Sequence, residues 1–334
     1  MNRIIIIAEA GVNHNGKLKL AYKLVDVAKE CGADFIKFQT SIPKLHISKF
    51  AKKANYQIKN WKKRVSQLQM LQKISLTYND FKKLKKYCNK KKIEFLSTPF
   101  ELKSIDFLKS LNMKYFKIPS GEITNLPYLI KVAKLKKKVI LSTGMANLLE
   151  IKKALKVLTS NGTIKKNITV LQCNTEYPTP LRDANVKAML TIKKKFKVNV
   201  GYSDHTEGIE SSLAAAALGA SILEKHITLN KNLKGPDHKA SINPKELKKM
   251  IEGVRKITIA LGDGVKKISP SEKKNIKIAR TSIVAAKEIK KGEKFTTQNL
   301  TIKRPGNGIS PMKLFKIVGK FAKRSFLEDE LIKL

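Results

Sequence analysis

The sequence predicts an α/β protein built as a (β/α)8 (TIM) barrel and followed by a small β-rich domain. Eight short apolar runs recur along the chain, an amphipathic segment with helical spacing follows each run, and polar residues cluster where each run ends. Nearly continuous apolar strands indicate a parallel sheet that is covered on its outside. Eight such units within about 250 residues are typical of the barrel. A doubly wound open sheet is the alternative.

The eight predicted strands share runs of four or five mostly β-branched or aromatic residues. They are Ile4–Ala8, Phe35–Phe38, Glu94–Ser97, Tyr115–Ile118, Lys138–Leu141, Ile168–Leu171, Val198–Gly201 and Ser221–Glu224. The predicted helices share apolar residues spaced three or four positions apart. They are Leu18–Cys31, Tyr78–Asn89, Ser104–Leu111, Leu126–Leu135, Leu148–Leu158, Val186–Lys195, Glu210–Leu218 and the closing helix Pro244–Leu261.

The connection between the second strand and its helix, residues 41–77, is unusually long. It contains Tyr56, Gln57, Trp61 and the run Gln67–Gln72. An insertion of this length between a strand and a helix either forms a lid or binding loop or is loop filler.

The barrel pattern ends near Leu261, where Gly262-Asp263-Gly264 interrupts it. We therefore predict a catalytic barrel at residues 1–262, a basic linker at 263–279 and a second domain at 280–334. The second domain contains the short strands Ser282–Ala286 and Leu300–Lys303. So short a segment cannot form a large core, and we expect it to pack on another surface.

The overall composition excludes several classes of protein. The chain has 334 residues, of which 42% are hydrophobic. Since no apolar run approaches the roughly 18–20 residues that span a bilayer, we expect no membrane segment. Cys31, Cys88 and Cys173 lie far apart, which argues against a disulfide framework and favours a reducing cytoplasm.

The formal net charge of +43 raises the possibility of a nucleic-acid partner. However, only seven of the 69 basic residues are arginines, and the lysines are spread along the whole chain. Proteins that read nucleic acids usually use arginine for bidentate contacts with bases. We therefore favour a general lysine bias without dedicated nucleic-acid binding, and keep a basic nucleic-acid-binding protein as a remote alternative.

Polar residues stand at the C-terminal end of every predicted strand. In a (β/α)8 barrel these ends meet at one mouth, where active sites lie. Any single cluster is also explained by turn and helix-capping chemistry, but eight together predict an enzyme site. The clusters are Glu9 with Asn13–Gly16, Lys37–Thr40, Ser97–Phe100, Lys117–Glu122, Ser142–Gly144, Cys173–Pro178, Tyr202–Thr206 and Glu224–His226.

Lys37 and Lys117 belong to apolar strands, and a buried lysine needs a partner. That partner is either a bound anion or the carboxylates of Glu9 and Glu122, and both can apply at once, because the lysines need counter-ions when no ligand is bound. Hydroxyls at nearby strand ends could complete a site for a phosphate and a carboxylate, and they are Thr98, Ser120 and Ser203.

His205 and His226 end neighbouring strands and could share a divalent metal, Mn²⁺ or Mg²⁺, with open positions for water. The alternative is two histidines that make ordinary hydrogen bonds. His14 and His238 are weaker candidates, and His46 is expected at the surface. Strand-terminal carboxylates could orient a sugar hydroxyl, transfer a proton or balance lysine charge, and they are Glu9, Glu122 and Glu224.

Nine ordered motifs resemble the sialic acid synthase family. They are AEAGVNHNG (Ala8–Gly16), KFQT (Lys37–Thr40), STPF (Ser97–Phe100), KIPSGEITNLPYL (Lys117–Leu129), STGM (Ser142–Met145), NTEYPTP (Asn174–Pro180), GYSDHT (Gly201–Thr206), EKHITL (Glu224–Leu229) and GPDHKAS (Gly235–Ser241). The segment Arg280–Leu334, with KRPGNGISP (Lys303–Pro311), resembles the antifreeze-like (SAF) domain of that family. The resemblance runs from about residue 3 to the end.

This resemblance implies a condensation of phosphoenolpyruvate with the open-chain aldehyde of N-acetylmannosamine and water, which gives N-acetylneuraminate and releases phosphate by C–O cleavage. It places the metal on His205 and His226. The residues that it implies for phosphoenolpyruvate are Lys37, Thr98, Lys117, Ser120 and Ser203. Those that it implies for the sugar, metal-bound water or proton transfer are Glu9, Gln39, Glu122, Tyr177 and Glu224, with Lys117 also among the catalytic residues.

The resemblance also implies a domain-swapped homodimer in which Arg304 reaches the partner's site. Asp237 and Thr175 are expected to be substrate-binding residues. Thr175 occupies a position where some sialic acid synthases carry asparagine. This difference leaves a second acceptor open, 2,4-diacetamido-2,4,6-trideoxy-mannose, which would make the protein an N,N'-diacetyllegionaminate synthase.

Overall fold

The computed structural model describes residues 3–60 and 65–334, so Trp61 lies outside the described residues. The chain divides into two compact units between Asp263 and Gly264. Each unit has its own apolar core. Among the described residues, no helix is both long and apolar enough to cross a bilayer.

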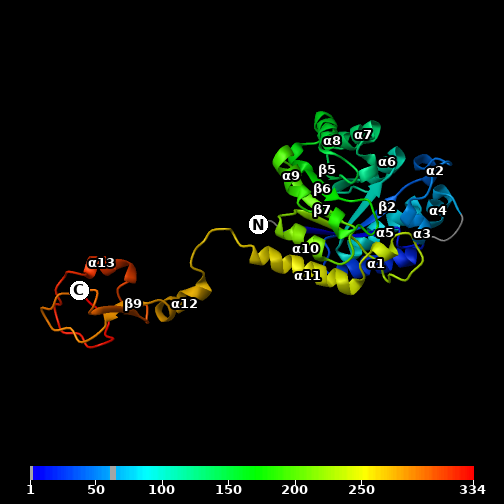
Figure 1. The fold of residues 1–334 in the computed structure, drawn as a ribbon. Helices are drawn as coiled ribbons and strands as arrows, with labels where there is room; N and C mark the ends of the chain where they lie inside the picture. The colour runs from blue at the N-terminus through cyan, green and yellow to red at the C-terminus, as the bar shows by residue number, and fades with distance from the viewer. Residues whose placement is uncertain (1–2, 61–64) are drawn as a thin grey trace. The chain divides into compact units, whose positions relative to one another are not determined.

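The first unit confirms the predicted barrel. Its eight strands pair in parallel in the order β3-β2-β1-β8-β7-β6-β5-β4, and β3 and β4 lie next to each other. The strands occupy the centre of this unit in Figure 1, with the helices around them. They are β1 (Ile5–Gly11), β2 (Phe35–Thr40), β3 (Glu94–Pro99), β4 (Tyr115–Ile118), β5 (Lys138–Ser142), β6 (Ile168–Cys173), β7 (Asn199–Asp204) and β8 (Ile222–His226).

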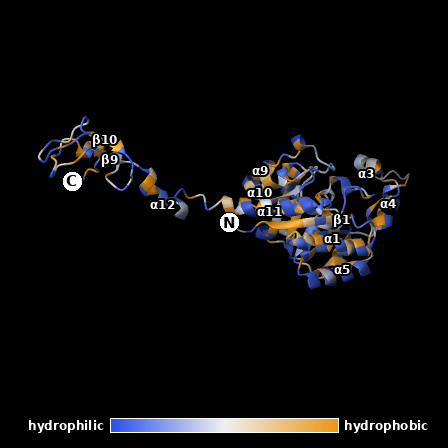
Figure 2. Cartoon of the chain, turned by 90° about the horizontal axis from the view of Figure 1, so that it is seen from below, coloured by the Kyte–Doolittle hydropathy of each residue, from blue (hydrophilic) through white to orange (hydrophobic). Residues whose placement is uncertain are grey.

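Each strand is followed by a helix whose apolar face packs on the barrel. In Figure 2, β1 is strongly hydrophobic, whereas the outer helices carry both hydrophilic and hydrophobic residues. Several helices begin with a capping box, such as Thr77 with Asp80 and Asn147 with Glu150, which satisfies free backbone N–H groups. The helices are α1 (Leu18–Glu30), α5 (Tyr78–Lys91), α6 (Leu102–Ser110), α7 (Leu126–Lys134), α8 (Leu148–Ser160), α9 (Ala188–Phe196), α10 (Glu210–Ala217) and α11 (Pro244–Ala260).

All strands except β4 extend one to three residues further toward the mouth than the apolar runs predict. Glu9, Gln39, Thr98 and His226 therefore belong to the strands themselves rather than to the following loops. The apolar signal stops early because side chains alternate between the two faces of a strand, and near the mouth the inward face is polar. Strand pairing holds these side chains in place.

The long connection after β2 forms three short helices, α2 (Pro43–His46), α3 (Asn55–Asn60) and α4 (Gln67–Ile74). Ser66 caps α4 in a capping box with Gln69. Met70 and Ile74 of α4 pack on Val12, which follows β1. This contact fixes α4 next to the end of β1 and makes the connection part of the barrel's mouth.

The second unit is small. It contains α12 (Pro270–Ala279), β9 (Ser282–Ala285), β10 (Leu300–Lys303) and α13 (Leu314–Ile317), and β9 pairs with β10 in antiparallel fashion. Its core includes Ile283, Phe295 and Phe326. The helix α12 falls within residues 263–279, which the sequence predicts to be a linker. Gly306 N donates a hydrogen bond to Lys277 O near the end of this helix. These residues are therefore ordered against the second unit.

Candidate active site

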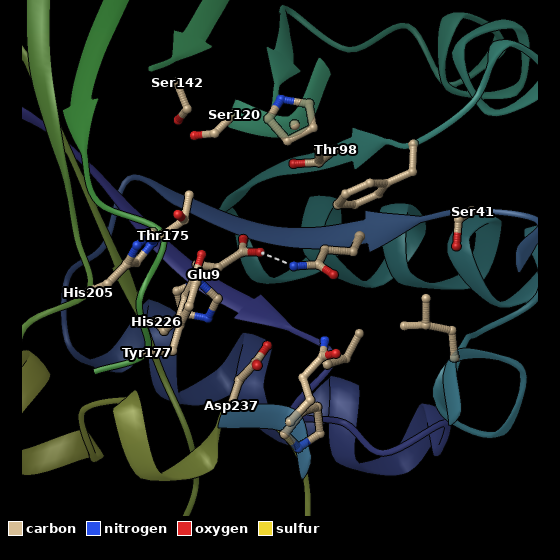
Figure 3. Close-up of a pocket in the computed structure, with 18 of the residues that line it drawn as sticks. Glu9, Ser41, Thr98, Ser120, Ser142, Thr175, Tyr177, His205, His226 and Asp237 are labelled. Atoms are coloured by element: carbon tan, nitrogen blue, oxygen red, sulfur yellow. Dashed lines mark hydrogen bonds between the residues drawn. The ribbon is translucent and has the colours of Figure 1, made fainter. Parts of the chain in front are cut away.

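A cavity of about 260 Å³ opens at the C-terminal ends of the barrel strands (Figure 3). Its wall comes from strand ends, from the loops after β6 and β8, and from the connection after β2. The residues predicted from sequence that line it are Glu9, Lys37, Gln39, Thr98, Lys117, Ser120, Thr175, Tyr177, Ser203, His205, Glu224, His226 and Asp237. The barrel thus gathers residues from seven strands or strand-following loops into one site.

Two lysines and two carboxylates form a buried network at the bottom of the cavity. Lys37 Nζ lies 2.9 Å from Glu9 Oε2 and 3.4 Å from Glu224 Oε1. Lys117 Nζ lies 3.1 Å from the same Glu224 oxygen, to which Ser203 Oγ also donates at 3.1 Å. Gln39 Nε2 donates to Glu9 Oε1 at 3.4 Å. The charges balance within the network, so an anionic ligand would have to compete with the carboxylates for the lysines.

Burial and ion pairing shift the pKa values of the two carboxyl groups in opposite directions. Burial raises the pKa of Glu9 to about 7, against the opposing effect of Lys37. Burial acts in the same direction on Glu224, but Lys117 and Lys37 outweigh it and hold the pKa of Glu224 well below its usual range. Burial therefore favours the neutral form of Glu9, whereas the two lysines favour the ionised form of Glu224.

The structure corrects the predicted partner of Lys117, which pairs with Glu224 and not with Glu122. Glu122 lies in the 3-10 helix η1 (Ser120–Glu122), where its Oε2 accepts a hydrogen bond of 2.5 Å from Asn125 Nδ2. Among the described residues that line the cavity, Glu122 is absent. The partner of Lys117 is therefore not the carboxylate nearest to it in sequence, because the barrel places Glu224 of β8 next to it.

Hydroxyl groups surround the two lysines. Lys37 Nζ donates to Thr98 Oγ1 at 3.1 Å, and Gly144 N donates to Ser120 Oγ at 3.0 Å. Ser142 Oγ is buried in the cavity wall without a hydrogen-bond partner in the described part of the chain. Ser142 is not among the residues predicted as ligands, although its motif directly follows the fifth predicted strand. Figure 3 shows Ser120, Ser142 and Thr98 along one side of the cavity.

His205 and His226 lie together on the opposite side of the cavity, with ring centroids 5.3 Å apart (Figure 3). His205 Nδ1 donates to the backbone carbonyl of Asn174, which leaves Nε2 available, 3.4 Å from Ser203 Oγ. His226 Nδ1 is buried and unpartnered among the described residues. Burial lowers the pKa of His205 to about 4 and that of His226 well below its usual value.

Two neutral imidazoles with available nitrogens suit a divalent metal. In the described part of the chain, no three His, Cys, Asp or Glu side chains are grouped closely enough to hold a metal by themselves. A metal on this pair would therefore keep several positions for water or substrate, as a catalytic metal requires.

An aromatic and polar wall adjoins the histidines. Tyr177 stacks on His205, and Tyr56 of α3 lies 5.1 Å from Tyr177 between ring centroids. Asp237 is buried at the cavity edge, and burial raises its pKa to about 6. The long connection thus contributes to the binding site, since Tyr56 and Gln57 line the cavity.

One further position differs from expectation. His46 is predicted at the surface, but it lines the cavity and lies 5.0 Å from the Phe100 ring between centroids. Its helix α2 has only four residues, so its sequence pattern does not show which face lies against the cavity. Arg304 lies in the second unit, directly after β10.

Comparisons with known proteins show the family of this chain. The sequence matches the NeuB family over residues 24–266 and the SAF domain over residues 280–334. The chain belongs to the NeuB family. Both domains named by the resemblance are therefore confirmed.

Several relatives of this NeuB-family protein are named as synthases of sugar acids. It is 58% identical to the N,N'-diacetyllegionaminic acid synthase of Campylobacter jejuni over 333 residues, which cover 100% of both chains. It is 43% identical to the enzyme of the same name from Legionella pneumophila, over 94% of this chain and 89% of that one. The crystal structure of N-acetylneuraminic acid synthetase from Leptospira borgpetersenii matches with a TM-score of 0.73 and 34% identity, over 82% of this chain and 90% of that one.

Proposed function

We propose that the protein is an N,N'-diacetyllegionaminic acid synthase. It would condense phosphoenolpyruvate with open-chain 2,4-diacetamido-2,4,6-trideoxy-mannose and water, and release phosphate. The similarity to the Campylobacter jejuni enzyme along the whole chain carries this choice of acceptor. N-acetylmannosamine, the acceptor favoured from sequence, becomes the second candidate and is supported by the lower similarity to the Leptospira borgpetersenii synthetase.

The buried lysines supply the binding site for phosphoenolpyruvate in this proposal. Lys37 and Lys117 provide two positive charges in a site shielded from water, where interactions with an anion are strong. The hydroxyls of Thr98, Ser120 and Ser142 add hydrogen-bond donors for the phosphate or carboxylate oxygens. Binding would draw the lysines from Glu9 and Glu224 toward the ligand.

The reaction joins C3 of phosphoenolpyruvate to the aldehyde carbon, and water adds at C2 before the C–O bond to phosphate breaks. The aldehyde oxygen gains a proton and the attacking water loses one. Glu9 is the group in the network whose pKa of about 7 suits both directions of transfer, at its Oε1 or Oε2 atom. Glu224 stays ionised and balances the lysines.

His205 and His226 would hold a divalent metal, Mn²⁺ or Mg²⁺, through His205 Nε2 and an imidazole nitrogen of His226. When bound, it would supply electrophilic polarisation of the acceptor's carbonyl group. Tyr177, Gln39 and Asp237 would orient the sugar against this pair. Arg304 would complete the site from the partner subunit of a domain-swapped homodimer.

Phosphate release from phosphoenolpyruvate, measured with Mn²⁺ and each acceptor in parallel, tests the proposal. We expect kcat/KM to favour the 2,4-diacetamido sugar and EDTA to abolish release. A preference for N-acetylmannosamine would overturn the acceptor and leave the synthase chemistry intact. Phosphate release that EDTA does not change would overturn the proposed metal requirement. No phosphate release with either sugar would overturn the proposed reaction.

A further inference from the structure

The strands β7 and β8 carry both candidate metal ligands, and alternate side chains of these strands face opposite sides. The cavity-lining residues of the two strand ends are Ser203, His205, Glu224 and His226. Between them, Asp204 and Lys225 face away from the cavity, toward the helices that cover the barrel. The two residues are direct neighbours in the β7–β8 register.

Asp204 and Lys225 form an ion pair with no exposed side-chain surface. Lys225 Nζ lies 3.0 Å from Asp204 Oδ2, and both side chains are 0% exposed. Asp204 Oδ2 also accepts a hydrogen bond from Ser212 Oγ of α10 at 2.6 Å. The pair therefore links β7, β8 and a covering helix from behind the site.

The same pair fixes the backbone next to His205. Thr206 N and Oγ1 donate to Asp204 Oδ1 at 2.9 and 2.7 Å, and Lys225 Nζ donates to Thr206 O at 2.6 Å. Both polar backbone groups of Thr206 are thus held by the pair. Because His205 lies between Asp204 and Thr206, its backbone position depends on these three hydrogen bonds.

Stability alone is a weak reason for such a pair. Removing two charges from water is costly, and replacing a buried ion pair with uncharged residues of similar volume is often neutral or stabilising. What the ion pair supplies is a fixed geometry, since each charged group makes several directed hydrogen bonds. The pair fixes the geometry at Asp204 and Lys225, which directly precede His205 and His226 in the chain.

We propose that the Asp204–Lys225 pair is a positioning pair for the metal site, which sets the separation and orientation of the His205 and His226 imidazoles. This inference rests on the proposed function, because it assumes a metal on the two histidines. Groups that hydrogen-bond to metal-ligating histidines typically change metal affinity about 10–100-fold when removed, and the Asp204–Lys225 pair acts on the same histidines through the backbone.

The test is Mn²⁺ binding to the metal-stripped, full-length protein, followed by electron paramagnetic resonance of free Mn²⁺. The double variant Asp204→Asn/Lys225→Met removes both charges together and keeps an oxygen that can accept from Thr206 N. Arg255→Met is the matched control, because Arg255 Nη2 pairs with Asp34 at 2.8 Å beside the opposite, N-terminal end of β2. Thermal unfolding of each variant is measured in parallel.

We expect the double variant to bind Mn²⁺ at least about tenfold more weakly than the wild type, even where its unfolding temperature is preserved. Arg255→Met should keep the wild-type Kd within twofold, even if it unfolds at a lower temperature. An unchanged Kd in the double variant overturns the positioning role and leaves the metal proposal standing. A wild-type protein that binds no Mn²⁺ overturns both.

Ser212→Ala covers the case in which the double variant does not fold. It removes one hydrogen bond to Asp204 and leaves the ion pair in place. A Kd for Mn²⁺ that is two- to fivefold weaker supports the positioning role, and an unchanged Kd overturns it.

Discussion

The phenol ring of Tyr177 stacks on the imidazole of His205, with 4.2 Å between ring centroids and 29° between ring planes. The same phenol ring meets His226 edge-on, at 5.4 Å. One aromatic side chain therefore touches both candidate metal ligands. It also forms part of the wall where the acceptor sugar is proposed to bind.

Replacing Tyr177 with leucine should reduce kcat/KM for the acceptor by about tenfold, since an aromatic pair contributes about 0.5–1.5 kcal/mol beyond the area it buries and Tyr177 makes two such contacts. The KM for phosphoenolpyruvate should change little, because the lysines lie on other strands. Steady-state kinetics with each substrate varied in turn measures both. Tyr177→Phe keeps the ring and should stay within about threefold of the wild type; equal losses in the two variants would contradict a role for ring stacking.

Replacing Lys37 with methionine should remove phosphoenolpyruvate binding and destabilise the protein. Lys37 is buried between Glu9 and Glu224, and breaking a buried ion pair by removing one partner costs about 3–5 kcal/mol. The loss should also raise the pKa of Glu9 further, because the opposing charge of Lys37 disappears. Urea denaturation and calorimetric titration with phosphoenolpyruvate test these expectations.

Lys193→Met is the control for Lys37→Met, because Lys193 is exposed on α9 and is not among the described residues that line the cavity. It changes the net charge by the same amount and should leave ligand affinity and stability near wild type. A similar loss of affinity in both variants would assign anion capture to the overall charge of the chain.

The fold and most of the site could be predicted because local patterns carry the information. Apolar runs locate the strands, and the barrel's topology places every strand end at one mouth. The ends of the strands could not be predicted, since Gln39 or Thr98 reads as the start of a polar loop until pairing shows that the strand continues. Near the mouth, which side chains of a strand face inward depends on strand pairing, and pairing is a property of the tertiary structure.

Contacts between segments that are distant in sequence could not be predicted either, because local patterns do not show which segments meet in the fold. The partner of Lys117 is Glu224, across the barrel, and the nearby Glu122 is not its partner. Tyr56 reaches Tyr177 only because α3 folds over the mouth, and α3 is too short for helical periodicity to show which face it presents. The sequence identified the long connection but not which of its residues line the cavity.

The stability of the barrel should fall as the pH drops from about 6.5 to about 4, partly because of His14. Burial lowers the pKa of His14 to about 4, from an ordinary value of 6.5. Below pH 6.5 the unfolded chain takes up a proton that the folded protein does not, so the unfolded state gains relative stability. Because each tenfold difference in proton affinity between the two states corresponds to about 1.4 kcal/mol, the contribution of His14 approaches about 3 kcal/mol.

His14→Gln should flatten this pH dependence. The free energy of unfolding, obtained from urea denaturation between pH 7.5 and pH 4.5, should decline less steeply in the variant than in the wild type. At pH 7.5 the imidazole is neutral in both states, so the difference in free energy of unfolding between wild type and variant gives the packing cost of the substitution. Parallel curves across the whole range would show that His14 titrates normally in the folded protein.

Adding a single methyl group at Gly144 should weaken phosphoenolpyruvate binding. A Cβ atom there would lie 2.6 Å from Thr175 Cγ2 and 2.9 Å from Ser120 Oγ, both in the cavity wall. Ser120, which lines the cavity and accepts a hydrogen bond from Gly144 N, would have to move. We expect calorimetric titration to show a weaker Kd for phosphoenolpyruvate in Gly144→Ala than in the wild type, at an unfolding temperature measured in parallel. Equal affinities would mean that Ser120 does not contact the ligand.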